Sequence, residues 1–129
     1  MENIQAMLFR FLQAFSRLQL DEMMEFFVDD ATAFFPIKHQ YFLQVGKEAI
    51  SDSFASVIAR IRSSGATRIR LDPHEVRVKV FDDIAVVTFY ICDEELNRRT
   101  LVLRRVEAGW HIEHLHGSNA PLSTNQTVT

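Results

Sequence analysis

The chain has 129 residues, of which 47% are hydrophobic and 24% charged, and its formal net charge is -3. This length suits one globular domain with its own core, and the acidic balance argues against a nucleic-acid partner, which needs a basic face. The single cysteine, Cys92, excludes a disulfide within the chain and suits the reducing cytoplasm. We find no signal-peptide pattern and no apolar run long enough to span a bilayer, so we expect no membrane association.

The spacing of apolar residues predicts three helices in the first half of the chain. The first covers Ile4 to Leu18, where apolar residues recur every three or four positions. Asp21 is placed as the N-cap of a short second helix, and Asp29-Asp30 ends it. Gly46 opens a third helix, and Gly65 is its expected C-terminal stop.

A period of two predicts strands in the second half of the chain. Short turns between them indicate consecutive antiparallel hairpins with the helices packed on one face. We assign residues 1–118 to a single domain and 119–129 to a polar C-terminal tail. The expected strands cover residues 31–35, between the second and third helices, and then 68–71, 76–80, 84–92, 100–106 and 110–116.

The strand that begins at Ile84 is apolar on both sides through Ile91. A sheet with one face in water would alternate apolar and polar residues, so both faces of this strand must be covered. The helices cover one face. A second copy of the chain is the simplest cover for the other, and we therefore predict a homodimer through the convex sheet face.

Three stretches of the sequence carry a family resemblance. The first helix leads into Phe27-Val28-Asp29-Asp30-Ala31, Val45-Gly46-Lys47-Glu48-Ala49-Ile50 enters the third helix, and the sheet closes on Gly109 to Ser118. Their order and spacing resemble the nuclear transport factor 2-like superfamily, and within it the SnoaL-like domains. The closing stretch, continued through Asn119-Ala120-Pro121, is also similar to the end of the association domain of calcium/calmodulin-dependent protein kinase II.

The resemblance implies an α+β, cystatin-like fold: a cone-shaped, curved antiparallel sheet wrapped around three N-terminal helices. It also implies a pocket between the helices and the concave side of the sheet, and usually a dimer. It implies no single activity, because the superfamily includes isomerases, cyclases, dehydratases, epoxide hydrolases and non-enzymatic modules. The function has to be argued from the site itself.

His114 and His116 are the candidate catalytic residues. They lie two positions apart on the last expected strand, so we expect them to share a face with Trp110 and Ile112. Facing the pocket, an imidazole could anchor a ligand or act as a general base near neutral pH. The two histidines could instead be structural, each satisfied by a carbonyl or a carboxylate. A metal site is disfavoured because two ligands are too few for zinc, and we expect neither a metal nor a cofactor.

Four further residues are candidates for ligand binding. Trp110 shares the expected face of the histidines, Tyr90 lies on a core strand, and Tyr41 lies in the irregular segment that could close the pocket mouth. The kinase association domains use pocket arginines to hold a small carboxylate, and Arg104 or Arg105 is the counterpart by strand. Strand parity allows only one of the two to face inward, and we name Arg104 as the candidate.

Two functions fit these residues. The first is a SnoaL-like pocket protein for a small apolar or weakly acidic molecule, with lyase, isomerase or cyclase activity that uses a pocket histidine as base. The second is a non-catalytic dimeric module for ligand binding or assembly. The carboxylate pattern of the ketosteroid isomerases is absent, because the strands from Val76 to Val80 and from Ile84 to Ile91 carry no inward acid.

Overall fold

The computed structural model describes residues 3–107 and 109–122, which form three helices and six strands. No helix within these ranges has the length and apolar character needed to cross a membrane. In chain order the elements are α1 (Ile4–Ser16), α2 (Leu20–Met24), β1 (Phe27–Phe34), β2 (Gln44–Val45), α3 (Lys47–Ser63), β3 (Pro73–Phe81), β4 (Ile84–Cys92), β5 (Glu95–Val106) and β6 (Gly109–Pro121).

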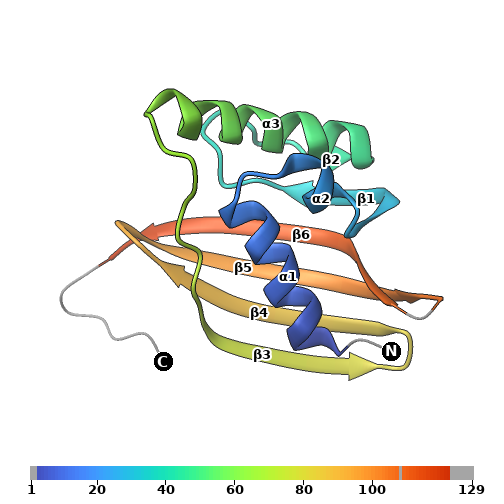
Figure 1. Cartoon of the computed structure of the whole chain (residues 1–129). Coiled ribbons are helices and arrows are strands. Elements are labelled where there is room, and N and C mark those ends of the chain that lie inside the picture. The colour runs from blue at the N-terminus through green and yellow to red at the C-terminus, as the bar shows by residue number, and fades with distance from the viewer. Residues whose placement is uncertain (1–2, 108, 123–129) are drawn as a thin grey trace.

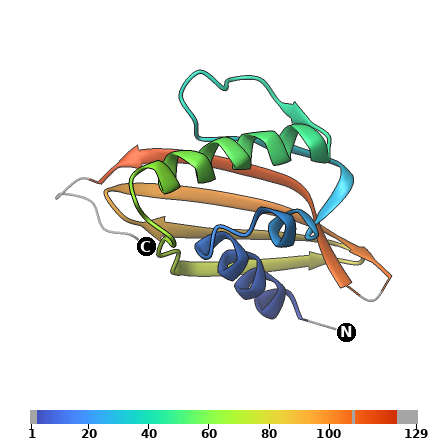
Figure 2. The same cartoon turned by 45° about the horizontal axis from the view of Figure 1, so that its top comes forward.

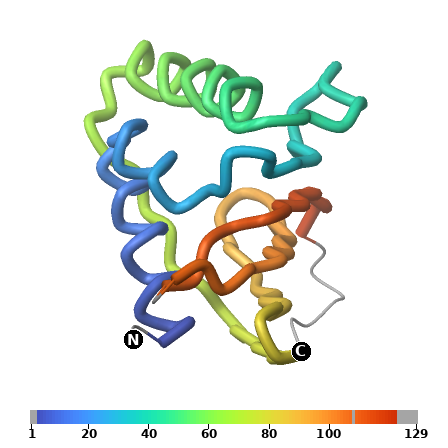
Figure 3. Tube along the Cα trace, turned by 90° about the vertical axis from the view of Figure 1, so that its right-hand side faces the viewer, coloured from blue at the N-terminus to red at the C-terminus, as the bar shows by residue number. Residues whose placement is uncertain are grey.

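The strands form one curved, open sheet in the order β2-β1-β6-β5-β4-β3. Strands β3 to β6 are consecutive antiparallel hairpins, as the sequence predicts. β1 runs parallel to β6, so the sheet is not antiparallel throughout. Figure 1 shows α1 crossing one face of the sheet, with α3 along its β1 side. We call this the inner face; in Figure 3 the helices lie on this side and leave the opposite, outer face uncovered.

Several element boundaries differ from the sequence-based expectation. β1 runs through Asp29-Asp30, because it pairs with β6 on both sides of them, at Phe27 and from Thr32 onward, although the register is irregular in between. Asp21 lies inside α2 and does not cap it; the N-cap position is Gln19, without a side-chain bond. Residues 68–71 alternate in sequence but form no strand. β6 continues to Pro121, so the start of the expected tail is strand, whereas residues 123–129 lie outside the described part.

The inner face of the sheet and the helices enclose one hydrophobic core. On β4 the side chains that point inward, such as Val87 and Phe89, are almost fully buried, and those that point outward are half-buried or exposed. Phe54 of α3 lies at the centre of an aromatic cluster. Its ring packs edge-on against Phe15 of α1 at 5.3 Å and against Phe35, which follows β1, at 5.0 Å between centroids. This cluster lies between α1, α3 and the sheet.

Candidate functional site

An interior cavity of about 270 Å³ lies between the inner face of the sheet and the helices. Most of its wall is apolar, as expected for a small-molecule pocket, although its volume is just below the usual range of about 300–1,000 Å³. The cavity therefore suits a small ligand. Aromatic rings from four elements dominate the wall: Phe11 and Phe15 of α1, Phe35 beyond β1, Phe54 of α3 and Phe89 of β4.

Arg99 of β5 brings a positive charge to this cavity, and it also borders a second, more open hollow described below. It lies two residues before Leu101, which is buried in the same wall, so strand alternation points both side chains inward. Its Nη1 donates to the carbonyl of Arg98 at 2.9 Å, to the carbonyl of Ser118 at 3.3 Å and to Oδ1 of Asn119 at 3.0 Å. Among the described residues, no acceptor is bonded to Nε or Nη2 of Arg99.

Gly117 of β6 makes room for the Arg99 side chain. A Cβ atom at this position would lie 2.9 Å from Cδ of Pro36 and 3.2 Å from Nη1 of Arg99. The 2.9 Å distance to the proline ring is shorter than Cβ atoms in real structures keep from other heavy atoms. The absence of a side chain therefore lets β6, the Pro36 ring and the guanidinium pack against one another.

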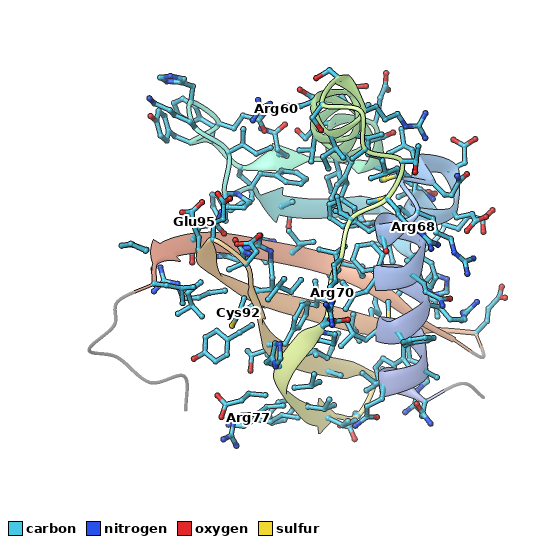
Figure 4. The ribbon with its side chains drawn as sticks, turned by 60° about the vertical axis from the view of Figure 1, so that its left-hand side comes forward. Arg60, Arg68, Arg70, Arg77, Cys92 and Glu95 are labelled. Carbon is cyan, nitrogen blue, oxygen red and sulfur yellow. The ribbon has the colours of Figure 1, made fainter. Side chains whose placement is uncertain are left out.

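Polar residues lie at the solvent-accessible end of the cavity. Arg60 of α3 and Asp93 of the β4–β5 turn are exposed, and Asn97 of β5, which also lines the cavity, is buried. Figure 4 shows Arg60 on α3 and Glu95 near the β4–β5 turn. Burial lowers the pKa of Arg99, and the carboxylates of Asp93 and Glu95 oppose this effect. The guanidinium remains cationic near neutral pH, because arginine titrates far above it.

The two candidate histidines lie on the outer face, away from this cavity. In the pairing of β5 with β6, Val102 faces His114 and Leu103 faces Ile112, so Glu113 is an extra residue in β6. Such a bulge shifts the alternation by one position. The prediction that His114 shares a face with Ile112 and Trp110 is therefore wrong. Leu115, not His114 or His116, faces the interior cavity.

Each histidine has a defined neighbourhood on the outer face. Nδ1 of His114 lies 2.7 Å from Oγ1 of Thr32 on β1, and the Phe34 ring lies against His114 at 5.8 Å and His116 at 5.2 Å between centroids. Desolvation lowers the pKa of His114, and the nearby His116 lowers it further, whereas a hydrogen bond with Thr32 opposes both effects. His114 is therefore neutral over more of the physiological range than an exposed histidine.

None of the four predicted ligand-binding residues lines the interior cavity. Trp110 is buried on the inner face, at the end of the sheet near the start of α1, with the guanidinium of Arg105 4.8 Å from its ring centroid. Tyr41 is 72% exposed on the loop before β2. Arg104 points outward, where its Nη2 lies 3.0 Å from a carboxylate oxygen of Glu113, and the inward member of the pair is Arg105.

Tyr90 belongs to a polar hollow on the outer face. Strand register aligns Arg77, Thr88, Thr100 and His116 in one row across β3, β4, β5 and β6. This row and Tyr90 contribute to an outer hollow of about 450 Å³. Within residues 3–107 and 109–122, no group of three or more His, Cys, Asp or Glu side chains is arranged to hold a metal ion.

Arg99 is the residue that sequence-based reasoning missed. The sequence did contain the information needed to find it. Leu101 and Leu103 are apolar and two positions apart on β5, and this alternation indicates which residues of the strand point inward. Extending that parity two residues towards the N-terminus places Arg99 inward and Arg98 outward. The extra residue at Glu113 had no comparable signal in the sequence.

Comparison with known proteins gives a consistent family assignment. A family model described as SnoaL-like domain matches residues 4–123. No curated protein matches the sequence. A nuclear transport factor 2-like protein of unknown function from Pseudomonas putida superimposes with a TM-score of 0.79 at 21% identity, covering 95% of this chain and 87% of the other.

Two further solved structures are similar. One, described as a calcium/calmodulin-dependent protein kinase type II association domain from Thiobacillus denitrificans, has a TM-score of 0.69 and 24% identity, covering 94% of this chain and 96% of the other. A ketosteroid isomerase-like protein from Erwinia carotovora atroseptica has a TM-score of 0.68 and 19% identity, covering 90% and 92%. At these identities the likeness shows the fold alone.

Proposed function

Because the chain belongs to the SnoaL-like domain family and its interior cavity combines an aromatic wall with one inward cation, we propose that it binds a small molecule with an apolar body and an acidic group. The single observation that carries this proposal is the incomplete hydrogen bonding of the Arg99 guanidinium. Its Nη1 is held by three acceptors, while Nε and Nη2 have no partner among the described residues. A ligand carboxylate could accept from both nitrogens at once.

The energetics of the site favour an anionic ligand. Partly burying a guanidinium costs free energy unless opposite charge and hydrogen bonds compensate. Asp93 of the β4–β5 turn and Glu95 at the start of β5 supply some opposite charge, but neither forms a salt bridge with Arg99 in the described part of the chain. A bound carboxylate would complete the coordination of Arg99 while the aromatic wall holds the apolar body.

Catalysis by a histidine base stays a prediction of the sequence. His114 and His116 lie on the outer face, and no histidine is among the described residues that line the interior cavity. A lyase, isomerase or cyclase reaction that uses either imidazole would therefore have to take place at the outer hollow. Our proposal for the interior cavity is ligand binding and needs no histidine.

A homodimer through the outer face accompanies this proposal. Half-buried Ile84, Val86 and Val102 give the centre of that face an apolar character, and no helix of the described part covers it. At the usual spacings, five strands of nine residues present a face of about 700 Å². This is close to the roughly 800 Å² that each partner contributes to a standard interface. A second copy would bury the outward side of β4.

Isothermal titration calorimetry with benzoate tests the ligand proposal, and benzamide serves as the uncharged probe of the same shape. We expect Arg99→Gln to weaken benzoate binding by about 1.5–3 kcal/mol, roughly 10- to 150-fold, because a charge-assisted pair is lost. Benzamide binding should change little. Arg98→Gln is the matched control, because this neighbouring guanidinium points outward and bonds Oγ of Ser118.

Two results would contradict the ligand proposal. One is equal weakening of benzoate binding by Arg98→Gln and Arg99→Gln. The other is the absence of any heat of binding for both benzoate and longer aliphatic acids. Either result would leave the cavity as a packing defect of the core. A monomeric mass from light scattering at micromolar concentration would contradict the dimer and would leave the ligand proposal intact.

A further inference from the structure

Asn97 of β5 is a buried amide without a hydrogen-bond partner. Only 7% of its surface is exposed, and in the part of the chain that the structure describes no donor or acceptor bonds its side chain. Ser53, the other buried polar side chain of that part, differs in this respect, because its Oγ donates to Oε1 of Gln40 at 3.2 Å. A buried amide that makes no hydrogen bond costs free energy, so its presence in a folded protein requires a physical reason.

The side chain of Asn97 points into the interior cavity. It lies two residues before Arg99 and four before Leu101, and the pairing of β5 with both neighbouring strands is regular along this stretch. Strand alternation therefore gives these three side chains the same inward direction, and all three line the cavity. On β4 the residue paired with Asn97 is Ile91, which is buried in the same wall. The unpartnered amide thus belongs to the wall of the proposed ligand pocket.

The amide of Asn97 lies close to the guanidinium of Arg99. On β6 the residue paired with Asn97 is Asn119, and the Cβ atoms of such a pair are about 4.5–5.5 Å apart. Oδ1 of Asn119 accepts from Nη1 of Arg99 at 3.0 Å, so the guanidinium bends towards this pair. Figure 2 shows the start of β5 and the end of β6 side by side, at the end of the sheet where α3 also ends. One small ligand group can therefore reach both side chains.

We propose that the ligand of the interior cavity is a 2-hydroxy acid, whose carboxylate binds Arg99 and whose hydroxyl group binds Asn97. The inference rests on the ligand binding proposed above. Hydrogen bonds of about 2.9 Å to each side chain leave room between them for oxygen atoms on two adjacent carbons. A hydroxyl group can donate to Oδ1 of Asn97 and accept from its Nδ2, whereas a ketone oxygen can only accept. The hydroxyl group therefore satisfies the amide more fully.

Mandelate and phenylacetate test this proposal, because they are the same acid with and without the 2-hydroxyl group. Isothermal titration calorimetry measures both acids, with the two enantiomers of mandelate titrated separately. We expect the wild-type protein to bind one enantiomer about 3- to 10-fold more tightly than phenylacetate, which is the gain from one neutral hydrogen bond. Asn97→Leu replaces the amide with an apolar group of similar shape. It should abolish this preference and leave the affinity for phenylacetate unchanged, because the carboxylate still binds Arg99.

Thr100→Val is the matched control for Asn97→Leu. Thr100 lies on the same strand but pairs with His116 and borders the outer hollow, so its side chain points away from the interior cavity. The variant should keep the preference for mandelate. Because the amide of Asn97 has no partner to lose, Asn97→Leu should also keep or raise the Tm. A clearly lower Tm would mean that the amide has a structural role, and it would contradict the proposal.

The outcomes separate this inference from the ligand proposal. A wild-type preference below about twofold for both enantiomers overturns the 2-hydroxy acid, and so does a preference that survives Asn97→Leu. Phenylacetate binding that Arg99→Gln weakens would leave the ligand proposal intact in either case. The absence of binding for phenylacetate and both enantiomers overturns both proposals. The comparison of the two acids uses the wild-type protein alone, so it tests the inference whether or not the variants fold.

Discussion

Gly117→Ala should disturb the fold and the cavity together. The added methyl group would lie 2.9 Å from Cδ of Pro36, a ring atom that cannot rotate away, and 3.2 Å from Nη1 of Arg99. Overpacking of this kind costs about 1–3 kcal/mol. For a domain of 129 residues this loss corresponds to a Tm decrease of roughly 4–11 °C. Benzoate binding should weaken as well, because the guanidinium has to move.

Differential scanning calorimetry of Gly117→Ala and Gly109→Ala measures the effect. Gly109 is the matched control: it lies on the same strand, and its Cβ would have an ordinary contact of 3.6 Å with the His111 ring. We expect Gly109→Ala to stay within about 1 °C of wild type, since that contact costs little. A Tm for Gly117→Ala that equals that of Gly109→Ala would refute the close packing of Gly117, Pro36 and Arg99.

Three further predictions concern pH dependence, the core and a helix cap. Because the pKa of His114 is lowered in the folded state, the unfolded chain binds the proton more readily as pH falls through about 6.5, and stability should decrease there. Urea unfolding between about pH 8 and pH 5 should show a smaller loss for His114→Asn than for wild type, and an equal loss would contradict the assignment. Phe54→Ala should cost about 3–5 kcal/mol by urea unfolding, because its ring packs on three other phenylalanine rings. Asn3→Ala should cost about 0.5–2 kcal/mol in the same assay, because Oδ1 of Asn3 accepts from the Ala6 N–H at 2.7 Å; a cost near zero would mean that α1 does not depend on this cap.

Most of the fold could be predicted from the sequence, because the residue patterns that indicate its elements are local and repeated. The apolar spacing of α1, the glycines around α3, the alternation on β3 and the apolar run of β4 each predict an element from neighbouring residues. Gly46 and Gly65 have positive φ angles of 94° and 93°, as expected of residues that begin and end a helix without a side chain. The parallel pairing of β1 with β6 depends on residues about 80 positions apart, and no local pattern indicates it.

The site was harder to predict from the sequence, because the direction of the histidine side chains depends on one extra residue in β6. With regular alternation, His114 and His116 would have joined Ile112 on the inner face, as the sequence suggested. The extra residue at Glu113 reverses the parity, so the histidines point outward and Leu115 points inward. Arg99 could have been found from Leu101 and Leu103, because all three lie before that irregularity in the chain. Such a bulge depends on how β6 pairs with β5, and the sequence of one strand does not reveal that pairing.

The most direct test of the central claim is a crystal structure of the complex with 4-bromobenzoate, in which anomalous scattering locates the bromine. We predict that the carboxylate accepts hydrogen bonds from Nε and Nη2 of Arg99 and that the bromine lies in the interior cavity, among the rings of Phe15, Phe54 and Phe89. A bromine peak in the outer hollow, beside His116 and Arg98, would contradict the account and would return the histidines to the centre of the function.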